Sequence, residues 1–134
     1  MTASWKMLSL GTIKDALPPP GDYQGAVIST KLIEKPTELW LQVTFGLRDH
    51  AEEIRHIHCL AAAPGSLYRH RIIDGQRALN RLLTAGKREL ASPDPAVLPE
   101  LLTGIRLTLT IGHKTVDGVP ELVLRNITPA NPEA

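Results

Sequence analysis

The sequence contains one cysteine, no long apolar run and almost no net charge, and each absence narrows its function. Cys59 is the single cysteine, which excludes an intramolecular disulfide and a cysteine-rich zinc site. No apolar run approaches the roughly 20 residues that span a bilayer, and the N-terminus has no secretory-signal pattern. We therefore expect a cytoplasmic protein without a membrane partner. With 15 Lys+Arg and 14 Asp+Glu, the formal charge of +1 neither demands nor excludes a nucleic-acid partner.

Common catalytic motifs are also absent. The chain has no Gly-rich phosphate loop followed by Lys-Ser/Thr, no Gly-x-Ser-x-Gly nucleophile elbow and no His-Glu-x-x-His. His56, His58 and Cys59 invite a metal interpretation, but alternation along a strand places the two histidines on one face and the cysteine on the other. At most two ligands converge. We expect a protein that is not an enzyme and has no cofactor and no metal site.

The length and composition are those of one folded domain. A chain of 134 residues with 43% hydrophobic types buries one core but not two. Three consecutive prolines at positions 18–20 exclude regular helix and inner strand. They separate an N-terminal arm, residues 1–16, from a domain expected over residues 17–128, and residues 129–134 form a short tail.

Alternating apolar residues predict five strands. The clearest pattern starts at Leu39, where Leu, Val and Phe alternate with polar residues over ten positions. Asp117-Gly118 is a hairpin-turn signal, and Gly25 marks an expected bend or bulge in the first strand. The predicted strands cover residues 23–33, 39–48, 54–60, 105–111 and 121–127.

One long helix is predicted between the third and fourth strands. Ser66 is expected as its N-cap, and it runs to about Ala85 with Gly86 as the C′ residue. A further helical turn is expected at residues 100–102. The apolar stripe of the long helix consists of Leu67, Ile72, Leu79, Leu82 and Leu83. Its cations are the clearest charge cluster in the chain: Arg69, Arg71, Arg77, Arg81, Lys87 and Arg88.

This order of elements, three strands, a helix and two strands, indicates an all-β domain with one main helix. Five antiparallel strands with a helix in that position are typical of the OB-fold, a small partly open barrel that binds oligonucleotides across its second and third strands. A split ferredoxin-like fold requires a helix after the first strand, and the pattern shows none. We expect a five-stranded antiparallel OB-fold barrel.

Trp40 is the aromatic residue with the most to decide. It lies on the face of the second strand opposite the apolar series, together with Gln42, Thr44 and Arg48. If that face is exposed, the indole offers a stacking surface for any base. The alternative is that the N-terminal arm or the helix covers Trp40 in a second small core, as is usual for large aromatic side chains. The sequence leaves both open.

The other candidates are cations and hydroxyl groups on outward strand faces. Arg106, Thr108 and Thr110 share one face of the fourth strand, Arg55 is a neighbour from the third, and Lys114 is expected in the hairpin loop. Such groups contact phosphates without reading sequence, although a solvated exterior has the same composition. The candidate nucleic-acid-binding residues are Trp40, Gln42, Arg48, Arg55, Arg106, Thr108 and Lys114, with Arg77, Arg81 and Arg88 as a secondary basic site on the helix.

Three stretches resemble a known family. Residues 17–23 (LPPPGDY), residues 39–45 (LWLQVTF) and residues 101–112 (LLTGIRLTLTIG) resemble a family of small phage and mobile-element proteins. That family has a Leu-Pro-x-Gly-x-Tyr start, an aromatic-Leu second strand and a Leu-x-Gly stretch before the fourth strand. It is similar to OB-fold single-stranded-DNA-binding proteins of phage replication and recombination. The resemblance covers about residues 17–128, but the start carries an extra proline and the last six residues hold a single acid rather than an acidic tail.

These features lead to ordered functional hypotheses. The first is non-catalytic binding of single-stranded DNA through an aromatic and basic barrel face, in phage or mobile-element replication or recombination as the resemblance implies. The second is a protein-protein interaction module on the same barrel, and the third a small nuclease-inhibitor or regulatory subunit. We also expect a homo-oligomer, because a sheet edge has unpaired backbone groups and the arm from Trp5 to Leu10 is apolar enough to dock on a neighbour.

Overall fold

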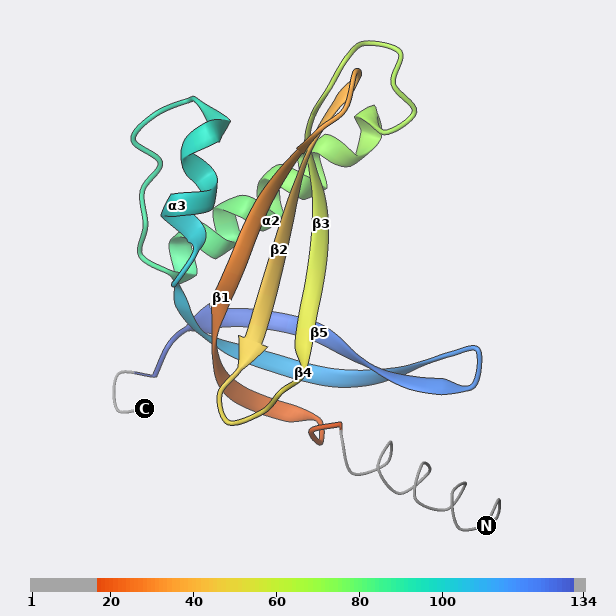
Figure 1. Cartoon of the computed structure of the whole chain (residues 1–134), viewed down its shortest axis with the longest axis vertical. Coiled ribbons are helices and arrows are strands. Elements are labelled where there is room, and N and C mark those ends of the chain that lie inside the picture. The colour runs from red at the N-terminus through yellow and green to blue at the C-terminus, as the bar shows by residue number, and fades with distance from the viewer. Residues whose placement is uncertain (1–16, 132–134) are drawn as a thin grey trace.

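The computed structural model describes residues 17–131, which form five strands and two short helices (Figure 1). The expected docking arm from Trp5 to Leu10 and the end of the predicted tail, residues 132–134, lie outside the described residues. In chain order the elements are β1 (Gly21–Glu34), β2 (Glu38–Leu47), β3 (Glu53–Ala62), the 3-10 turn η1 (Arg69–Arg71), α2 (Ile72–Ala85), the 3-10 turn η2 (Pro95–Val97), α3 (Leu98–Leu102), β4 (Arg106–Val116) and β5 (Val119–Pro129).

The strands form one antiparallel sheet in the order β3-β2-β1-β4-β5. β1 links its two halves, because residues 21–26 pair with β4 whereas residues 25–34 pair with β2. The β1–β2 register shifts between Val27 and Ser29, which makes a bulge at Ile28. In Figure 1, β1 bends so that β4 and β5 run across the lower ends of the other strands. The predicted mostly-β fold with a helix between β3 and β4 is therefore confirmed.

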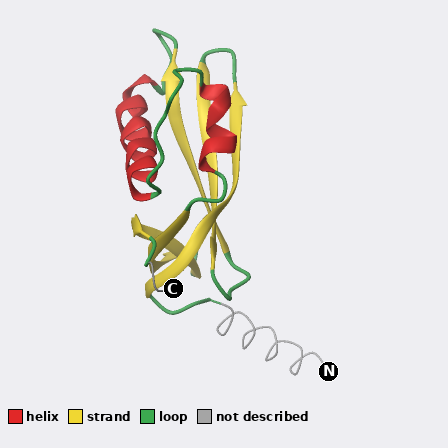
Figure 2. Cartoon of the chain, turned by 90° about the vertical axis from the view of Figure 1, so that its left-hand side faces the viewer, coloured by secondary structure: helices red, strands yellow, loops and turns green. Residues whose placement is uncertain are grey.

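One face of the sheet carries the core, as the alternating pattern predicts. Leu41, Val43 and Phe45 of β2 are at most 3% exposed, and Leu107 and Leu109 of β4 are fully buried. Helices α2 and α3 contribute their own apolar side chains to this cluster. Figure 2 shows both helices beside the β1–β3 half of the sheet. We call this covered side the inner face and the opposite side the outer face.

The sheet is open, whereas the sequence analysis expected a barrel. Within residues 17–131, β3 and β5 are the two edges, and no ladder of backbone hydrogen bonds joins them. Helix α2 stands at the β3 edge instead: Gly75 approaches the backbone of Cys59, and Gln76 Nε2 donates to the Leu60 carbonyl at 3.2 Å. A cleft remains between the helix and the two edges.

The long helix starts later than its sequence signals indicate. Ser66 is not an N-cap, because its hydroxyl donates to Glu38 Oε2 at 3.3 Å and accepts the Tyr68 N–H at 3.2 Å in a preceding turn. Leu67, placed in the apolar stripe from its spacing, is 85% exposed and precedes the helix. At the other end Gly86 has φ −84°, and Lys87 adopts the left-handed conformation expected of the C′ residue.

The second hairpin is as predicted at its turn and longer than predicted in its strands. Asp117 and Gly118 have φ of 51° and 79°, both in the left-handed region that such a turn requires. Lys114, expected in the loop, lies inside β4 and pairs with Glu121. Within residues 17–131, neither helix is long and apolar enough to cross a membrane.

Candidate nucleic-acid interface

Trp40 is covered, so the expected exposed stacking surface is wrong. Its side chain is 7% exposed. The Tyr68 ring packs edge-on at 5.0 Å between centroids, with Arg71 Cζ at 5.8 Å and Lys35 Nζ at 6.0 Å from the indole centroid. The segment between β3 and α2 thus folds back over the outer face at this point. Thr44, expected to face solvent beside Trp40, is 3% exposed.

The rest of the predicted site divides between two surfaces. Gln42 pairs with Ile57, Thr44 with Arg55, and Ala26 with Arg106, which places these side chains on the outer face. Lys114 lies elsewhere, close enough to His56 on the inner face to lower its pKa. The predicted residues that share the outer face with exposed or half-buried side chains are Gln42, Arg48, Arg55, Arg106 and Thr108.

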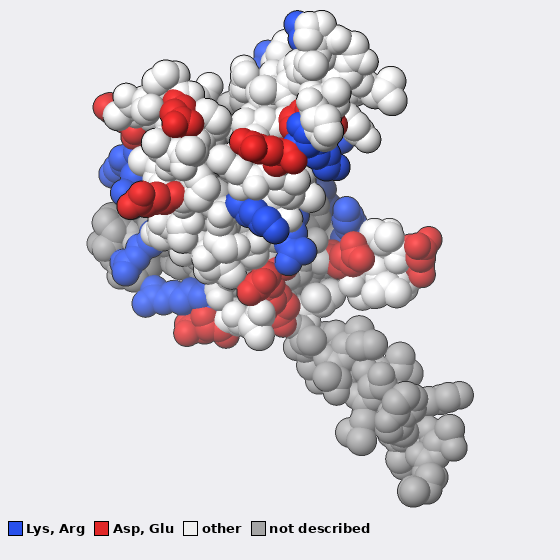
Figure 3. All heavy atoms as spheres, turned by 45° about the horizontal axis from the view of Figure 1, so that its top comes forward, with Lys and Arg blue, Asp and Glu red and all other residues white. Residues whose placement is uncertain are grey.

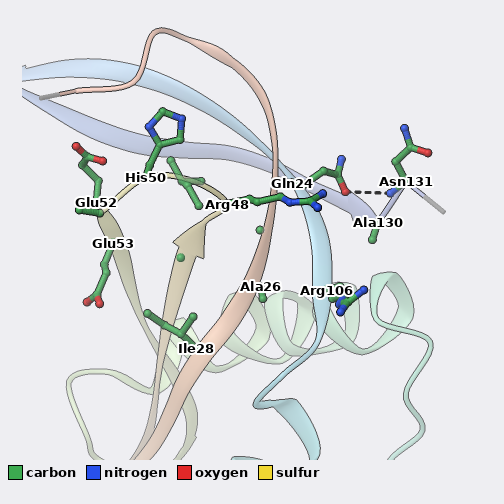
Figure 4. Close-up of a pocket in the computed structure, with 14 residues that line it drawn as sticks. Gln24, Ala26, Ile28, Arg48, His50, Glu52, Glu53, Arg106, Ala130 and Asn131 are labelled. Atoms are coloured by element: carbon green, nitrogen blue, oxygen red, sulfur yellow. Dashed lines mark hydrogen bonds between the residues drawn. The ribbon is translucent and has the colours of Figure 1, made fainter. Parts of the chain in front are cut away.

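Two of the predicted arginines line the same pocket. A hollow of about 640 Å³ opens on the outer face where β1 bends, bounded by the β2–β3 turn, the start of β4 and the chain after β5. Arg48 enters it from the end of β2 and Arg106 from the start of β4 (Figure 4). Within residues 17–131, neither guanidinium group has a hydrogen-bond or ion-pair partner. Both are available to an anionic ligand.

Hydrogen bonds fix the cationic end of this pocket. Gln24 Nε2 donates to the Thr108 hydroxyl at 2.9 Å, and Gln24 Oε1 accepts the Asn131 N–H at 3.1 Å (Figure 4). The backbone N–H of Arg48 donates to the Gln24 carbonyl at 2.8 Å. Gln24 therefore ties together the strands that carry the two arginines, and the Thr108 hydroxyl is engaged in this network.

Carboxylates occupy the other end of the same pocket. Glu52 and Glu53 line it from the β2–β3 turn, at the end opposite Arg106 in Figure 4. On the molecule as a whole, basic and acidic side chains are intermixed, as the face drawn in Figure 3 shows. A polyanion is therefore expected to follow the arginine end of the pocket and to avoid the β2–β3 turn.

Several outer-face residues were not found from the sequence. Ile28 and Ile57 are 45% and 48% exposed there, and Lys31, which pairs with Gln42, adds an exposed cation. Small residues form the floor, because Ala26 pairs with Gly46. A floor of small residues lets a ligand approach the backbone closely. The alternation signal could have identified Lys31 only if the bulge at Ile28 had been placed.

The basic helix is separate from this interface. Arg77 and Arg81 are exposed on α2, which packs on the inner face through Leu82 and Leu83, and Arg88 follows the helix in a loop. The secondary basic site predicted from these three arginines thus lies apart from the outer face.

The two strand histidines face inward. His56 and His58 pair with Val43 and Leu41 of the inner face, with their rings edge-on at 5.7 Å between centroids. Burial is the main cause that lowers the pKa of both, and nearby cations lower it further. Cys59 pairs with Trp40 on the other face. Across residues 17–131, no group of three or more His, Cys, Asp or Glu side chains is placed to hold a metal ion.

No protein-family model and no curated protein matches the chain. The function therefore has to be argued from the site.

Proposed function

We propose that this protein binds single-stranded DNA, without catalysis, along the arginine end of the outer face. The observation that carries the proposal is the convergence of Arg48 and Arg106, from strands that are not neighbours in the sheet, on one pocket in which neither has a partner. Unpaired guanidinium groups bind phosphate oxygens, and these contacts supply affinity that does not depend on sequence.

The strand arrangement supports an OB-type assignment. β1 pairs with both β2 and β4, the single long helix lies between β3 and β4, and the free edges of β3 and β5 lie on either side of one cleft. A partly open five-stranded OB barrel has this connectivity and binds oligonucleotides on its strand-two and strand-three face. The resemblance to phage and mobile-element proteins points to the same ligand and to a role in replication or recombination.

The contacts differ from those expected at first. Because Trp40 is covered, the apolar contacts to bases come from the exposed side chains of Ile28 and Ile57. Lys31 and Arg55 extend the cationic path from the pocket toward these residues. We expect weak, salt-sensitive binding with little preference among bases, because few stacking surfaces and no base-specific fork are offered.

Fluorescence anisotropy of a labelled oligo(dT) tests this proposal. The label has to be on the DNA, because the covered Trp40 is a poor reporter. Arg106→Ala and Arg48→Ala should each weaken binding and reduce the salt slope by about 0.7–1, the share of one phosphate contact. Arg77→Ala, an exposed arginine on α2, is the matched control and should change neither. Equal losses in all three variants would assign the effect to overall charge.

A protein-binding function is the second candidate, because Ile28 and Ile57 expose apolar surface that phosphate contacts do not need. Exposed aliphatic residues bordered by polar ones are typical of protein-interaction surfaces. Oligo(dT) that fails to bind at low salt, together with a partner whose capture is lost on Ile28→Asp but not on Arg77→Ala, would favour this function.

A further inference from the structure

A second pocket lies on the inner side of the sheet, between α2 and the open edges of β3 and β5. Its volume is about 180 Å³. The floor is apolar, and the strands and helix around it contribute the side chains of Leu41, Val43, Phe45, Leu79, Leu82, Leu124 and Ile127. We call it the edge cleft.

The wall of the edge cleft is polar and cationic. His56 and His58 line it from β3 and Asn126 from β5, while Arg81 from α2 and Arg125 from β5 bring two guanidinium groups to it. Arg125 Nη2 also donates to the His113 carbonyl at 3.5 Å, a long contact. No Asp or Glu is among the residues that line the cleft. The cleft therefore favours a ligand that joins an apolar part to an anion.

The size of the cleft limits the apolar part to one ring. An engineered apolar cavity of about 150 Å³ accepts benzene, so about 180 Å³ holds a six-membered ring and is small for a fused purine. A plain phenyl ring would leave the polar groups of the wall unpaired, which costs binding energy. The imidazole nitrogens of His56 and His58 and the amide of Asn126 match the carbonyl and ring-nitrogen edge of a pyrimidine.

We infer that the edge cleft binds a pyrimidine nucleotide, with the base among the inner-face side chains and the phosphate on Arg81 and Arg125. The ligand chemistry is the same for a free pyrimidine mononucleotide and for the 5′-phosphorylated end of a strand. The inference does not rest on the outer-face interface, because the two pockets share no lining residue.

The histidine pair gives the site a pH dependence that can be measured. In the free protein, burial and cations hold the pKa of both imidazoles below the usual value, so they are neutral at pH 7. An anion bound beside them favours the protonated form and raises both pKa values. Binding is then linked to proton uptake and strengthens as the pH falls below 7. The cations around the pair are Lys114, Arg71, Arg81 and Arg125.

Titration of the full chain with dTMP, followed by the imidazole proton resonances, tests the site. We expect saturable shifts at His56 and His58, upward movement of both pKa values, and several-fold weaker binding of dAMP. Inorganic phosphate that shifts the two histidines as strongly as dTMP, or dAMP that binds as tightly, would overturn the inference. A 5′-phosphorylated oligo(dT) that competes with dTMP, where the 5′-hydroxyl form does not, would identify a strand end as a source of the same ligand.

Two variants and two controls make the result specific. Ala78→Leu fills the cleft from α2 and should abolish the dTMP shifts, and Arg81→Ala should weaken dTMP binding at least several-fold. If the larger side chain disturbs folding, Arg81→Ala alone decides. Arg77→Ala should leave dTMP binding unchanged, as should the Arg48→Ala/Arg106→Ala pair, which separates this site from the outer face. Unchanged dTMP binding in Arg81→Ala would contradict the inference.

Discussion

At the scale of single residues, Trp40 shows how a strand position acquires a structural role from another part of the chain. Its indole is held by Tyr68 and Arg71, which follow β3, and by Lys35 from the β1–β2 turn. We expect Trp40→Ala to lower the free energy of unfolding by about 3–5 kcal/mol, the usual cost of truncating a buried tryptophan. Thermal or urea unfolding measures the loss.

Ile57 provides the matched control for that measurement. It lies on the same face and is 48% exposed, so Ile57→Ala should change stability by about 0.5 kcal/mol or less. Trp40 Nε1 is buried without a hydrogen-bond partner, so Trp40→Phe should cost less than Trp40→Ala. A Trp40→Ala protein with an unchanged midpoint and weakened DNA binding would restore the stacking role that the structure contradicts.

His56 and His58 should make stability depend on pH. Their folded pKa values are lowered, chiefly by burial, so between those values and about 6.5 the unfolded chain binds more protons than the folded one. The free energy of unfolding should therefore fall as the pH drops from 7.5 through this range. Urea unfolding at several pH values should show a smaller decrease in His56→Gln/His58→Gln, whereas His70→Gln, an exposed residue of η1, should match the wild type.

At the scale of elements, Gly75 sets how closely α2 approaches β3. A Cβ at this position would overlap the carbonyl oxygen of Cys59. In an open helix, Gly→Ala stabilises by about 1 kcal/mol, but here we expect Gly75→Ala to destabilise by about 1–3 kcal/mol because the helix must move from the strand. Asn80→Ala, on an exposed position of the same helix, should be neutral or slightly stabilising. A stabilising Gly75→Ala would show that the helix has room to shift.

The sequence predicted which elements exist better than it predicted their phase and ends. Alternation identified the β2 and β4 inner faces, because both strands keep period two through the core. It could not phase β1, where the bulge at Ile28 moves Lys31 to the outer face. Ser66 has the residue type of an N-cap, yet Glu38 engages its hydroxyl. Such side-chain partners come from distant strands and leave no local signal.

The candidate site was predictable to the same extent. Arg48 and Arg106 were found because outward positions on clean strands can be read from alternation, but their convergence depends on the bend of β1. Trp40 could not be assigned, since its cover comes from residues beyond β3. Lys114 was misplaced because β4 continues past the last clear apolar position.

At the scale of the whole molecule, the open sheet predicts self-association. Helix α2 occupies part of the β3 edge through Gly75 and Gln76, whereas within residues 17–131 β5 has β4 as its single strand neighbour. Exposed edge strands tend to pair with another chain. Light scattering at micromolar concentration should give a mass above 14.6 kDa, the mass of one chain. A strict monomer across the micromolar range would contradict this prediction.

The salt dependence of oligo(dT) binding tests the proposed interface most directly, because it counts the phosphate contacts that the arginines make. The plot of log K against log salt should be linear with a negative slope for the wild type. Replacing both Arg48 and Arg106 by alanine should reduce the magnitude of that slope by about 1.4, since each contact to a single strand contributes about 0.7. No binding by the wild type at low salt, or a double variant with the wild-type slope and affinity, would contradict single-strand binding at this site.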